Sequence, residues 1–281
     1  MPTLFQNTGL FKRAKATFPV RHLKFNFSTS TRYWFNNDPY PTHLMNAMSS
    51  VFPRGELMLI EALRKLRPSI QDPTLLEQIS AFIGQEAIHA REHIAFNRYA
   101  EEQAIDLTTL ENQVDALYTQ MKKWLPNMHI MAVGCAIEHI TATLGSELLR
   151  STHWNQKMQG PVGQLWLWHA LEETEHKAVF FDAYQAAGGG YLLRALYMAL
   201  AGSSVALLIG NGWLRLLHKD QQLNAQGIVE FAREFAGPGG LLNGRTVRGL
   251  FDYFRPSFHP NDHDTAQLEQ QWRDELQLSP A

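Results

Sequence analysis

Two ten-residue stretches decide the fold of this chain: GQEAIHAREH at residues 84–93 and WHALEETEHK at residues 168–177. Each stretch contains a glutamate followed three positions later by a histidine, Glu86 with His89 and Glu173 with His176. Residues three apart lie on one face of an α-helix, so each pair directs a carboxylate and an imidazole to the same point. Each pair is preceded by a lone glutamate on an earlier apolar segment, Glu56 and Glu138 respectively.

Two single glutamates and two Glu-x-x-His pairs are the ligand set with which four-helix bundles hold two iron or manganese ions. Glu56 has Leu59, Ile60 and Leu63 at positions i+3, i+4 and i+7, so it lies on the apolar face of its helix. Glu61 is five positions further on, about 140° around the helix, and we expect it in solvent. A buried carboxylate without a partner is costly, and a metal ion removes that cost.

The segment 168–177 extends the ligand set by one histidine. His169 lies one turn before Glu173 and two turns before His176, so these three share a face. Glu172 is the alternative partner of His176 at i+4, but Glu173 aligns with His169 and repeats the first pair's spacing. In the first stretch, His93 continues the apolar face, either as a ligand or as a hydrogen-bond partner of one. The predicted metal ligands are therefore Glu56, Glu86, His89, Glu138, His169, Glu173 and His176.

Helical periodicity dominates the chain after Asp38, and no long run of alternating β-branched residues occurs. The fold class is therefore all-α, with the four ligand-bearing helices at its centre. We divide the chain into an irregular segment 1–40, a helical bundle 41–236 that carries a dinuclear metal site, and a tail 237–281 with a short helix. The helices predicted from periodicity, proline and glycine span residues 42–51, 54–66, 73–103, 108–124, 128–151, 161–187, 195–214, 227–235 and 265–276.

Composition excludes several classes of function. The net charge is −2, and the lysines and arginines are scattered, so nothing predicts binding to nucleic acid. Cys135 is the single cysteine, so no disulfide forms within the chain, and a reducing cytoplasm is the expected compartment. The first twenty residues lack the apolar run and cleavage site of a secretory signal.

Residues 195–214 carry no charge and are bracketed by Arg194 and Arg215. A bilayer requires a span of roughly 20 apolar residues, so the stretch is long enough for membrane contact. Its small residues, among them Gly202 and Gly210, instead suit a helix packed inside a bundle. We expect a buried helix in a cytoplasmic protein, with membrane association as the alternative.

Small residues also surround Glu138, since Gly134, Thr141 and Gly145 share its helix face. Such a face leaves space for a pocket beside the metal site, suited to a small-molecule or lipid-like substrate. Four aromatic side chains around the last ligand pair either shape this pocket or belong to the core: Trp166, Trp168, Phe180 and Phe181. His139 lies one position off the ligand face. Lys177 and Asp182 are candidates for hydrogen bonds to the ligands.

Three blocks resemble a bacterial family described as predicted metal-dependent hydrolases: THLMNAMSSVFPRGE at 42–56, FIGQEAIHAREHIAFN at 82–97 and WHALEETEHKAVFFD at 168–182. The resemblance extends from about Phe25 to FHPNDHD at 258–264. The ligand pattern is also similar to ferritin-like di-iron oxygenases, and His169 with Glu173 and His176 resembles the three-histidine site of arylamine N-oxygenases. These likenesses imply a ferritin-like four-helix bundle with additional helices.

Three functions are compatible with this pattern. The main expectation is an O2-activating oxygenase or oxidase with two metal ions, iron first and manganese or zinc as alternatives, and an external electron donor. The first alternative is a metal-dependent hydrolase that uses a metal-bridged hydroxide. The tail residues His259, Asp262, His263 and Asp264 would add to such a site, although a solvated turn is expected there. The second alternative is a non-enzymatic, ferritin-like iron-binding protein. A homodimer is a further expectation. No catalytic residue beyond the ligands is assigned.

Overall fold

The computed structural model describes residues 18–278, and this part of the chain is all-α, with one isolated bridge between Phe35 and Met158 in place of any strand. The all-α prediction is confirmed. The expectation about a secretory signal falls largely on residues 1–17, outside the described part.

The helices are α1 (Pro39–Leu66), α2 (Pro73–Glu102), α3 (Thr108–Trp124), α4 (Asn127–Arg150), α5 (Thr152–Asn155), α6 (Gly160–His176), α7 (Val179–Ala186), α8 (Tyr191–Lys219), α9 (Ala225–Ala236), α10 (Gly244–Asp252) and α11 (Ala266–Glu275), with 3-10 turns at Phe27–Thr29, Arg67–Ser69 and Pro260–Asp262.

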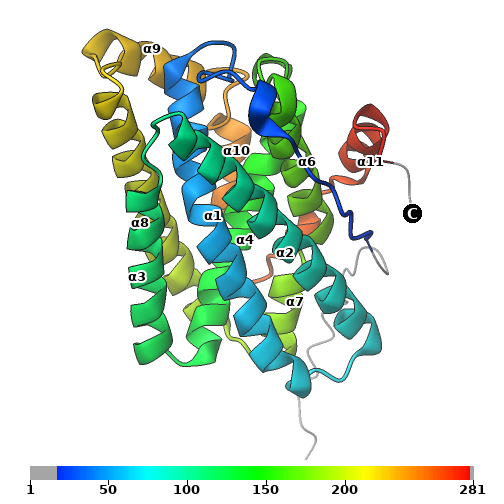
Figure 1. Cartoon of the computed structure of the whole chain (residues 1–281). Coiled ribbons are helices and arrows are strands. Elements are labelled where there is room, and N and C mark those ends of the chain that lie inside the picture. The colour runs from blue at the N-terminus through cyan, green and yellow to red at the C-terminus, as the bar shows by residue number, and fades with distance from the viewer. Residues whose placement is uncertain (1–17, 279–281) are drawn as a thin grey trace, which may run out of the picture.

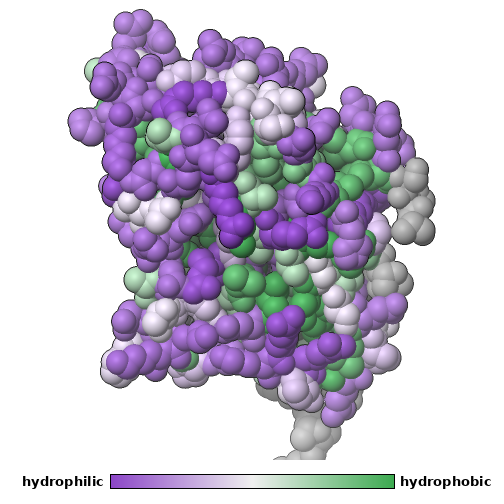
Figure 2. All heavy atoms as spheres, viewed as in Figure 1, coloured by the Kyte–Doolittle hydropathy of each residue, from purple (hydrophilic) through white to green (hydrophobic). Residues whose placement is uncertain are grey.

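The long helices run lengthwise side by side (Figure 1). Helix α1 packs against α2, α3, α4 and α8, while α4 packs against α6 and α8. Helix α10 contacts α4, and α11 contacts α4 and α6, so the C-terminal part of the chain packs on the bundle. Large side chains such as Phe82, Phe180 and Trp168 are fully buried between these helices. The face shown in Figure 2 is predominantly hydrophilic, with a hydrophobic area in its lower centre.

The first two ligand-bearing helices, α1 and α2, each begin with an aspartate followed by a proline. Asp38 precedes Pro39, and its side chain accepts a hydrogen bond from the backbone N–H of Tyr40. Asp72 precedes Pro73, and its side chain caps the first turn of α2. A capping aspartate satisfies an N–H that the helix leaves free, and proline at the first position has no N–H to satisfy.

The prediction that Pro53 separates two helices is wrong, because α1 continues through it from Pro39 to Leu66. Proline has no N–H for the carbonyl four residues earlier, which here belongs to Ser49. The amide of Asn97 on α2 donates a hydrogen bond to that carbonyl at 3.2 Å. A tertiary contact therefore replaces the missing helical bond, and sequence periodicity could not foresee it.

We expect Asn97→Ala to destabilise the protein by about 1–3 kcal/mol, because the buried Ser49 carbonyl would then lack a partner. In a Pro53→Ala background the restored N–H takes over this carbonyl, so the same substitution should cost less. Urea unfolding of the four proteins in this double-mutant cycle measures the coupling. Equal costs in both backgrounds would show that Asn97 acts through its other contacts.

Two further helix predictions are corrected. The segment predicted as one helix over 161–187 is divided, since α6 ends at His176 and α7 begins at Val179. At the break, the Lys177 ammonium donates to the carbonyl of His263 at 2.6 Å, on the C-terminal segment. The predicted tail also contains helix α10, which the glycine-rich and polar sequence there did not indicate. The division at residues 40 and 236 stays a prediction.

Helix α8 lies against the bundle on one face only, so the expectation of a buried helix is wrong. By length and composition this helix could cross a membrane. Of its most apolar 18-residue stretch, 17% is buried in the structure. On the side that faces the bundle, Gly212 allows α8 to lie close to Leu110 of α3, because a Cβ at this position would be 2.5 Å from the Leu110 side chain. Membrane contact through 195–214 stays a prediction, as does a homodimer.

Candidate metal centre

The structure brings all seven predicted ligands into one cluster inside the bundle, and each is at most 5% exposed. Helices α1 and α4 each contribute one glutamate, α2 contributes one Glu-x-x-His pair, and α6 contributes three residues. The members are Glu56, Glu86, His89, Glu138, His169, Glu173 and His176. Four helices from separate parts of the chain therefore converge on one point, as the repeated pattern predicts.

The atoms of the cluster lie at distances that a metal ion would bridge. The Nε2 atom of His176 is 3.2 Å from Glu86 Oε1, 3.4 Å from Glu138 Oε2 and 3.5 Å from Glu173 Oε1. The Nδ1 atom of His89 is 3.6 Å from Glu86 Oε1 and 3.7 Å from Glu173 Oε1. Three overlapping groups each hold three ligand atoms within 4.8 Å of one another, which is compatible with more than one ion.

Many of these ligand atoms have no hydrogen-bond partner within the protein, and this observation tests whether the residues fit a metal ion. Buried polar atoms are nearly always hydrogen-bonded, and an unpaired one costs stability. Six of the seven clustered side chains have a buried polar atom without a hydrogen-bond partner. These atoms are both oxygens of Glu56, Glu86 Oε1, His89 Nδ1, Glu138 Oε2, Glu173 Oε2 and His176 Nε2. Carboxylate and imidazole groups without a thiolate suit iron, manganese or zinc. The residues fit a metal centre.

Hydrogen bonds to the other ring nitrogens orient two of the histidines. His89 Nε2 lies 3.0 Å from Glu172 Oε2, so it carries the proton, and Nδ1 presents its lone pair to the cluster. His176 Nδ1 lies 3.1 Å from Gln85 Oε1, so Nε2 is the free atom. Arg21 in turn donates to Glu172 at 2.8 Å. Such partners fix the tautomer and the orientation of a metal-binding histidine.

A chain of hydrogen bonds orients His169 in the same way. The Ser49 hydroxyl donates to Asn97 Oδ1 at 2.6 Å and therefore accepts from His93 Nδ1 at 2.8 Å. His93 Nε2 then accepts from His169 Nδ1 at 2.7 Å. This leaves a lone pair on His169 Nε2, which faces Glu173 Oε1 at 3.0 Å. Two acceptors in this position repel each other unless a cation or a proton lies between them. His93 thus contacts a ligand and does not join the cluster.

Burial and neighbouring charges separate the pKa values of the carboxyl groups. Burial, together with Glu86, raises the pKa of Glu56 well above its ordinary value, and burial with Glu173 does the same for Glu138. For Glu173, burial acts upward, but His176 and His169 prevail and hold its pKa well below the ordinary value. In the metal-free chain these shifts favour the protonated forms of Glu56 and Glu138. A metal ion would displace these protons on binding.

We expect Glu56→Gln to stabilise the metal-free protein increasingly as the pH rises. A carboxyl whose pKa is raised on folding contributes stability that is fully present below its unfolded pKa of about 4.5 and is lost as pH rises through the folded value. Glutamine does not ionise, so the variant avoids this loss, with an advantage of at most ~1.4 kcal/mol per pH unit. Urea unfolding of chelator-treated proteins at pH 5 and pH 8 measures it.

The control for this experiment is Glu61→Gln, because Glu61 lies at the surface and accepts from Tyr118 and Lys122. The hydroxyl of Tyr118, and then Lys122, lower the pKa of Glu61, so its contribution is fully present at both pH values. The difference between this variant and the natural protein should be nearly equal at pH 5 and pH 8. A Glu56→Gln difference that is likewise independent of pH would contradict the prediction.

Comparison with known proteins agrees with this geometry. A family model described as "Predicted metal-dependent hydrolase" matches residues 19–264. The chain belongs to this family. No match was found among curated proteins or among solved structures. The family supports a metal-dependent hydrolase, and the main expectation of an O2-activating oxygenase is therefore wrong. The ligand pattern resembled that of oxygenases because helical glutamates and histidines do not by themselves distinguish the two chemistries.

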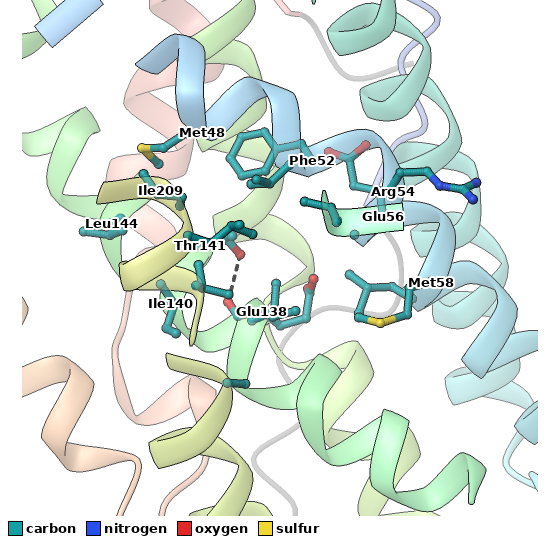
Figure 3. Close-up of a pocket in the computed structure, with 18 of the residues that line it drawn as sticks. Met48, Phe52, Arg54, Glu56, Met58, Glu138, Ile140, Thr141, Leu144 and Ile209 are labelled. Atoms are coloured by element: carbon teal, nitrogen blue, oxygen red, sulfur yellow. Dashed lines mark hydrogen bonds between the residues drawn. The ribbon is translucent and has the colours of Figure 1, made fainter. Parts of the chain in front are cut away.

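This family member has a cavity beside the cluster, lined by Glu56, Glu138 and Thr141 (Figure 3). Gly145 lines it as expected, but Gly134 does not, because a Cβ there would lie 2.3 Å from the Phe180 ring. Trp166 also lines the cavity, whereas the other three aromatic candidates, Trp168, Phe180 and Phe181, are core residues. Figure 3 shows the carboxylates of Glu56 and Glu138 toward the space between their helices, and Arg54 extending away from it.

Several candidate residues of the hydrolase do not reach the cluster. His139 lies within hydrogen-bond distance of the carbonyl of Gly249. Lys177 donates to the carbonyl of His263 on the C-terminal segment, and a contact between Lys177 and a ligand stays a prediction. Asp182 is also occupied elsewhere, 2.9 Å from His259. The tail residues form their own contacts: His259 with Asp182, His263 with Asp252, and Asp262 with Arg255. Asp264 accepts a hydrogen bond from the backbone N–H of Ala266, the first residue of α11.

Sequence reasoning missed the residues that hold the ligands in place. Glu172 was considered only as an alternative ligand, and Gln85 and Ser49 were not considered. Both Gln85 and Glu172 are fully buried next to a ligand in the chain, and that adjacency was an available signal. Arg21 lies in a segment without periodicity, and only the fold brings it to Glu172.

Proposed function

We propose that this protein is a hydrolase that acts on an ester at a centre of two divalent metal ions held by the seven clustered side chains. The observation that supports this proposal best is the set of buried, unpaired ligand atoms on four helices. A divalent ion held there would polarise a carbonyl or phosphoryl oxygen and lower the pKa of a bound water. Iron, manganese and zinc all suit the ligands, and hydrolysis requires no change of oxidation state.

The residues around the cluster hold the histidine rings in the orientation that metal binding requires. Glu172 and Gln85 hold His89 and His176 in the tautomers that present a lone pair to the cluster. His93 does the same for His169. Because these rings are already oriented, little reorganisation accompanies binding of the metal or the substrate.

The cavity supplies the remaining requirement, which is access for a substrate. Glu56, Glu138 and Glu173 belong both to the cluster and to the cavity wall. A bond at the inner end of the cavity therefore lies beside the ligand atoms. The buried helices around it exclude bulk water, which strengthens electrostatic interactions at the reacting bond.

Metal analysis followed by an activity assay tests the proposal. The purified protein should contain metal, measured by mass spectrometry, and should hydrolyse members of a panel of carboxylic esters and phosphoesters. Chelation should abolish the activity, and one of zinc, manganese or iron(II) should restore it. Glu61→Gln is the control, since Glu61 lies outside the cluster. Activity that survives complete removal of the metal would contradict the proposal.

A further inference from the structure

The cavity has a volume of about 310 Å³ and extends from the cluster outward between α1, α3, α4 and α8. Its size lies at the lower end of the range for small-molecule sites, about 300–1,000 Å³. Five side chains of the cluster line it, namely Glu56, Glu86, Glu138, His169 and Glu173. All five are buried, so the reactive groups lie in the inner part of the cavity wall.

The rest of the wall is apolar. Side chains from three helices make up most of it, such as Met48, Phe52, Ile140, Leu144, Leu208 and Ile209. Of the polar side chains in the wall, Thr141 donates to the Glu138 carbonyl at 3.2 Å and Tyr118 donates to Glu61 at 2.6 Å. A polar ligand would therefore find few partners beyond the cluster, and its burial there would be costly.

The cavity also lacks a free positive charge for an anionic ligand. Among its lining residues, all within the described part of the chain, the one lysine or arginine is Arg54. Its guanidinium forms an ion pair with Asp115 of α3, and Figure 3 shows it extending away from the cavity. Two divalent ions would balance the charge of the four glutamates in the wall, so the loaded centre would have little excess positive charge for a phosphomonoester. A neutral ester with an apolar chain avoids both penalties.

The cavity reaches the surface between α3 and α8. Leu117 of α3 and Leu200 of α8 both line it and are 49% and 52% exposed, respectively. The exposed face of α8 continues in apolar residues from this opening: Leu192, Leu196 and Leu207 are all more than half exposed. An apolar ligand that enters here would pass from the apolar face of α8 to the apolar wall of the cavity.

We propose that the substrate is a neutral carboxylic ester whose unbranched apolar acyl chain occupies this cavity, with its carbonyl at the cluster. The proposal rests on the hydrolytic function proposed above. One water is consumed: its oxygen forms a bond to the acyl carbon, and the bond from that carbon to the alkoxy oxygen breaks. The leaving alkoxide takes a proton, and the products are a carboxylic acid and an alcohol.

The first measurement is binding without catalysis. The metal-loaded protein is titrated with 1-hexanol, 1-octanol and 1-decanol by calorimetry. Burial of each added CH2 is worth about 0.8 kcal/mol, so affinity should rise about fourfold per CH2 until the chain fills the cavity. The second measurement is kcat/KM for p-nitrophenyl esters of increasing acyl length, which should rise in parallel.

Two neighbouring positions of α8 provide matched variants. Val205 lines the cavity, whereas Ala206 is exposed on the same helix and does not line it. Val205→Trp should fill the cavity and lower the affinity for 1-decanol at least tenfold, and Ala206→Trp should leave it unchanged. Val205→Gln, which adds polarity with little added bulk, should weaken binding as well. Circular dichroism and metal content establish that each variant folds and retains its centre.

The outcomes separate the two proposals. Metal-dependent hydrolysis without any dependence on chain length, or equal effects at positions 205 and 206, would overturn the assignment of an apolar acyl chain and leave the hydrolytic function standing. Binding that depends on chain length and on Val205, without hydrolysis of any ester by the metal-loaded protein, would overturn the hydrolytic function and the ester assignment with it.

Discussion

Replacing Glu86 with alanine will remove at least one metal ion from each chain, and His176→Ala will do the same. Glu86 is central to the cluster, because its Oε1 atom lies 3.2 Å from His176 Nε2 and 3.6 Å from His89 Nδ1. It belongs to two of the three groups of ligand atoms, and His176 belongs to one of them. Loss of a carboxylate shared between groups should weaken each of them, and ester hydrolysis should be lost with the metal.

Mass spectrometry of metal content, with Glu61→Ala beside the two variants, measures this effect. Glu61 is on the same helix as Glu56 but contacts Tyr118 and Lys122 at the surface. Its replacement should leave the metal content unchanged. Full metal content in both Glu86→Ala and His176→Ala would rule out the proposed centre, and loss of metal in Glu61→Ala would show that the wrong glutamate of α1 was chosen.

The second large effect concerns a residue that is not itself a predicted ligand. Glu172→Gln should lower the affinity for metal roughly 10–100-fold, the usual cost of losing a partner that orients a metal-binding histidine. Glu172 is fully buried and holds His89 Nε2 at 3.0 Å. Competition with a chelator of known affinity measures the change.

Glu175→Gln is the matched control. Glu175 is buried close to Glu172 and shares Arg21 with it. Its other partners are Arg273, at 2.7 Å, and the Gln85 amide, which donates to it at 3.4 Å; Glu175 itself touches no histidine of the cluster. Both variants remove one negative charge beside Arg21, so a general loss of stability should affect them alike. A similar fall in metal affinity in both would contradict a specific effect of the contact between Glu172 and His89.

The bundle could be predicted because its signals are local. The aspartate–proline pairs that begin α1 and α2, and the prolines and glycines between helices, act through the nearest turn of backbone. The boundaries of α3 were predicted to the residue. The break between α6 and α7 and the continuous α1 were missed. Lys177, and the Ser49 carbonyl that Pro53 leaves without a helical bond, both have partners far away in the sequence.

The function shows a different limit. The seven clustered side chains follow from helical spacing, which places Glu86 with His89 and Glu173 with His176 on one face each. Spacing does not distinguish hydrolysis from oxygen chemistry, because both use the same carboxylate and imidazole ligands. The family match over residues 19–264 favours hydrolysis.

By itself, the sequence of this protein determined the all-α fold and which faces of four helices carry carboxylates and imidazoles, because side-chain direction on a helix depends only on residue spacing. The tertiary structure alone decided which nitrogen of each histidine is free, since the partners Glu172 and Gln85 act across helix contacts. It also decided where the cavity opens, because the gap between α3 and α8 depends on how these helices pack against α1 and α4.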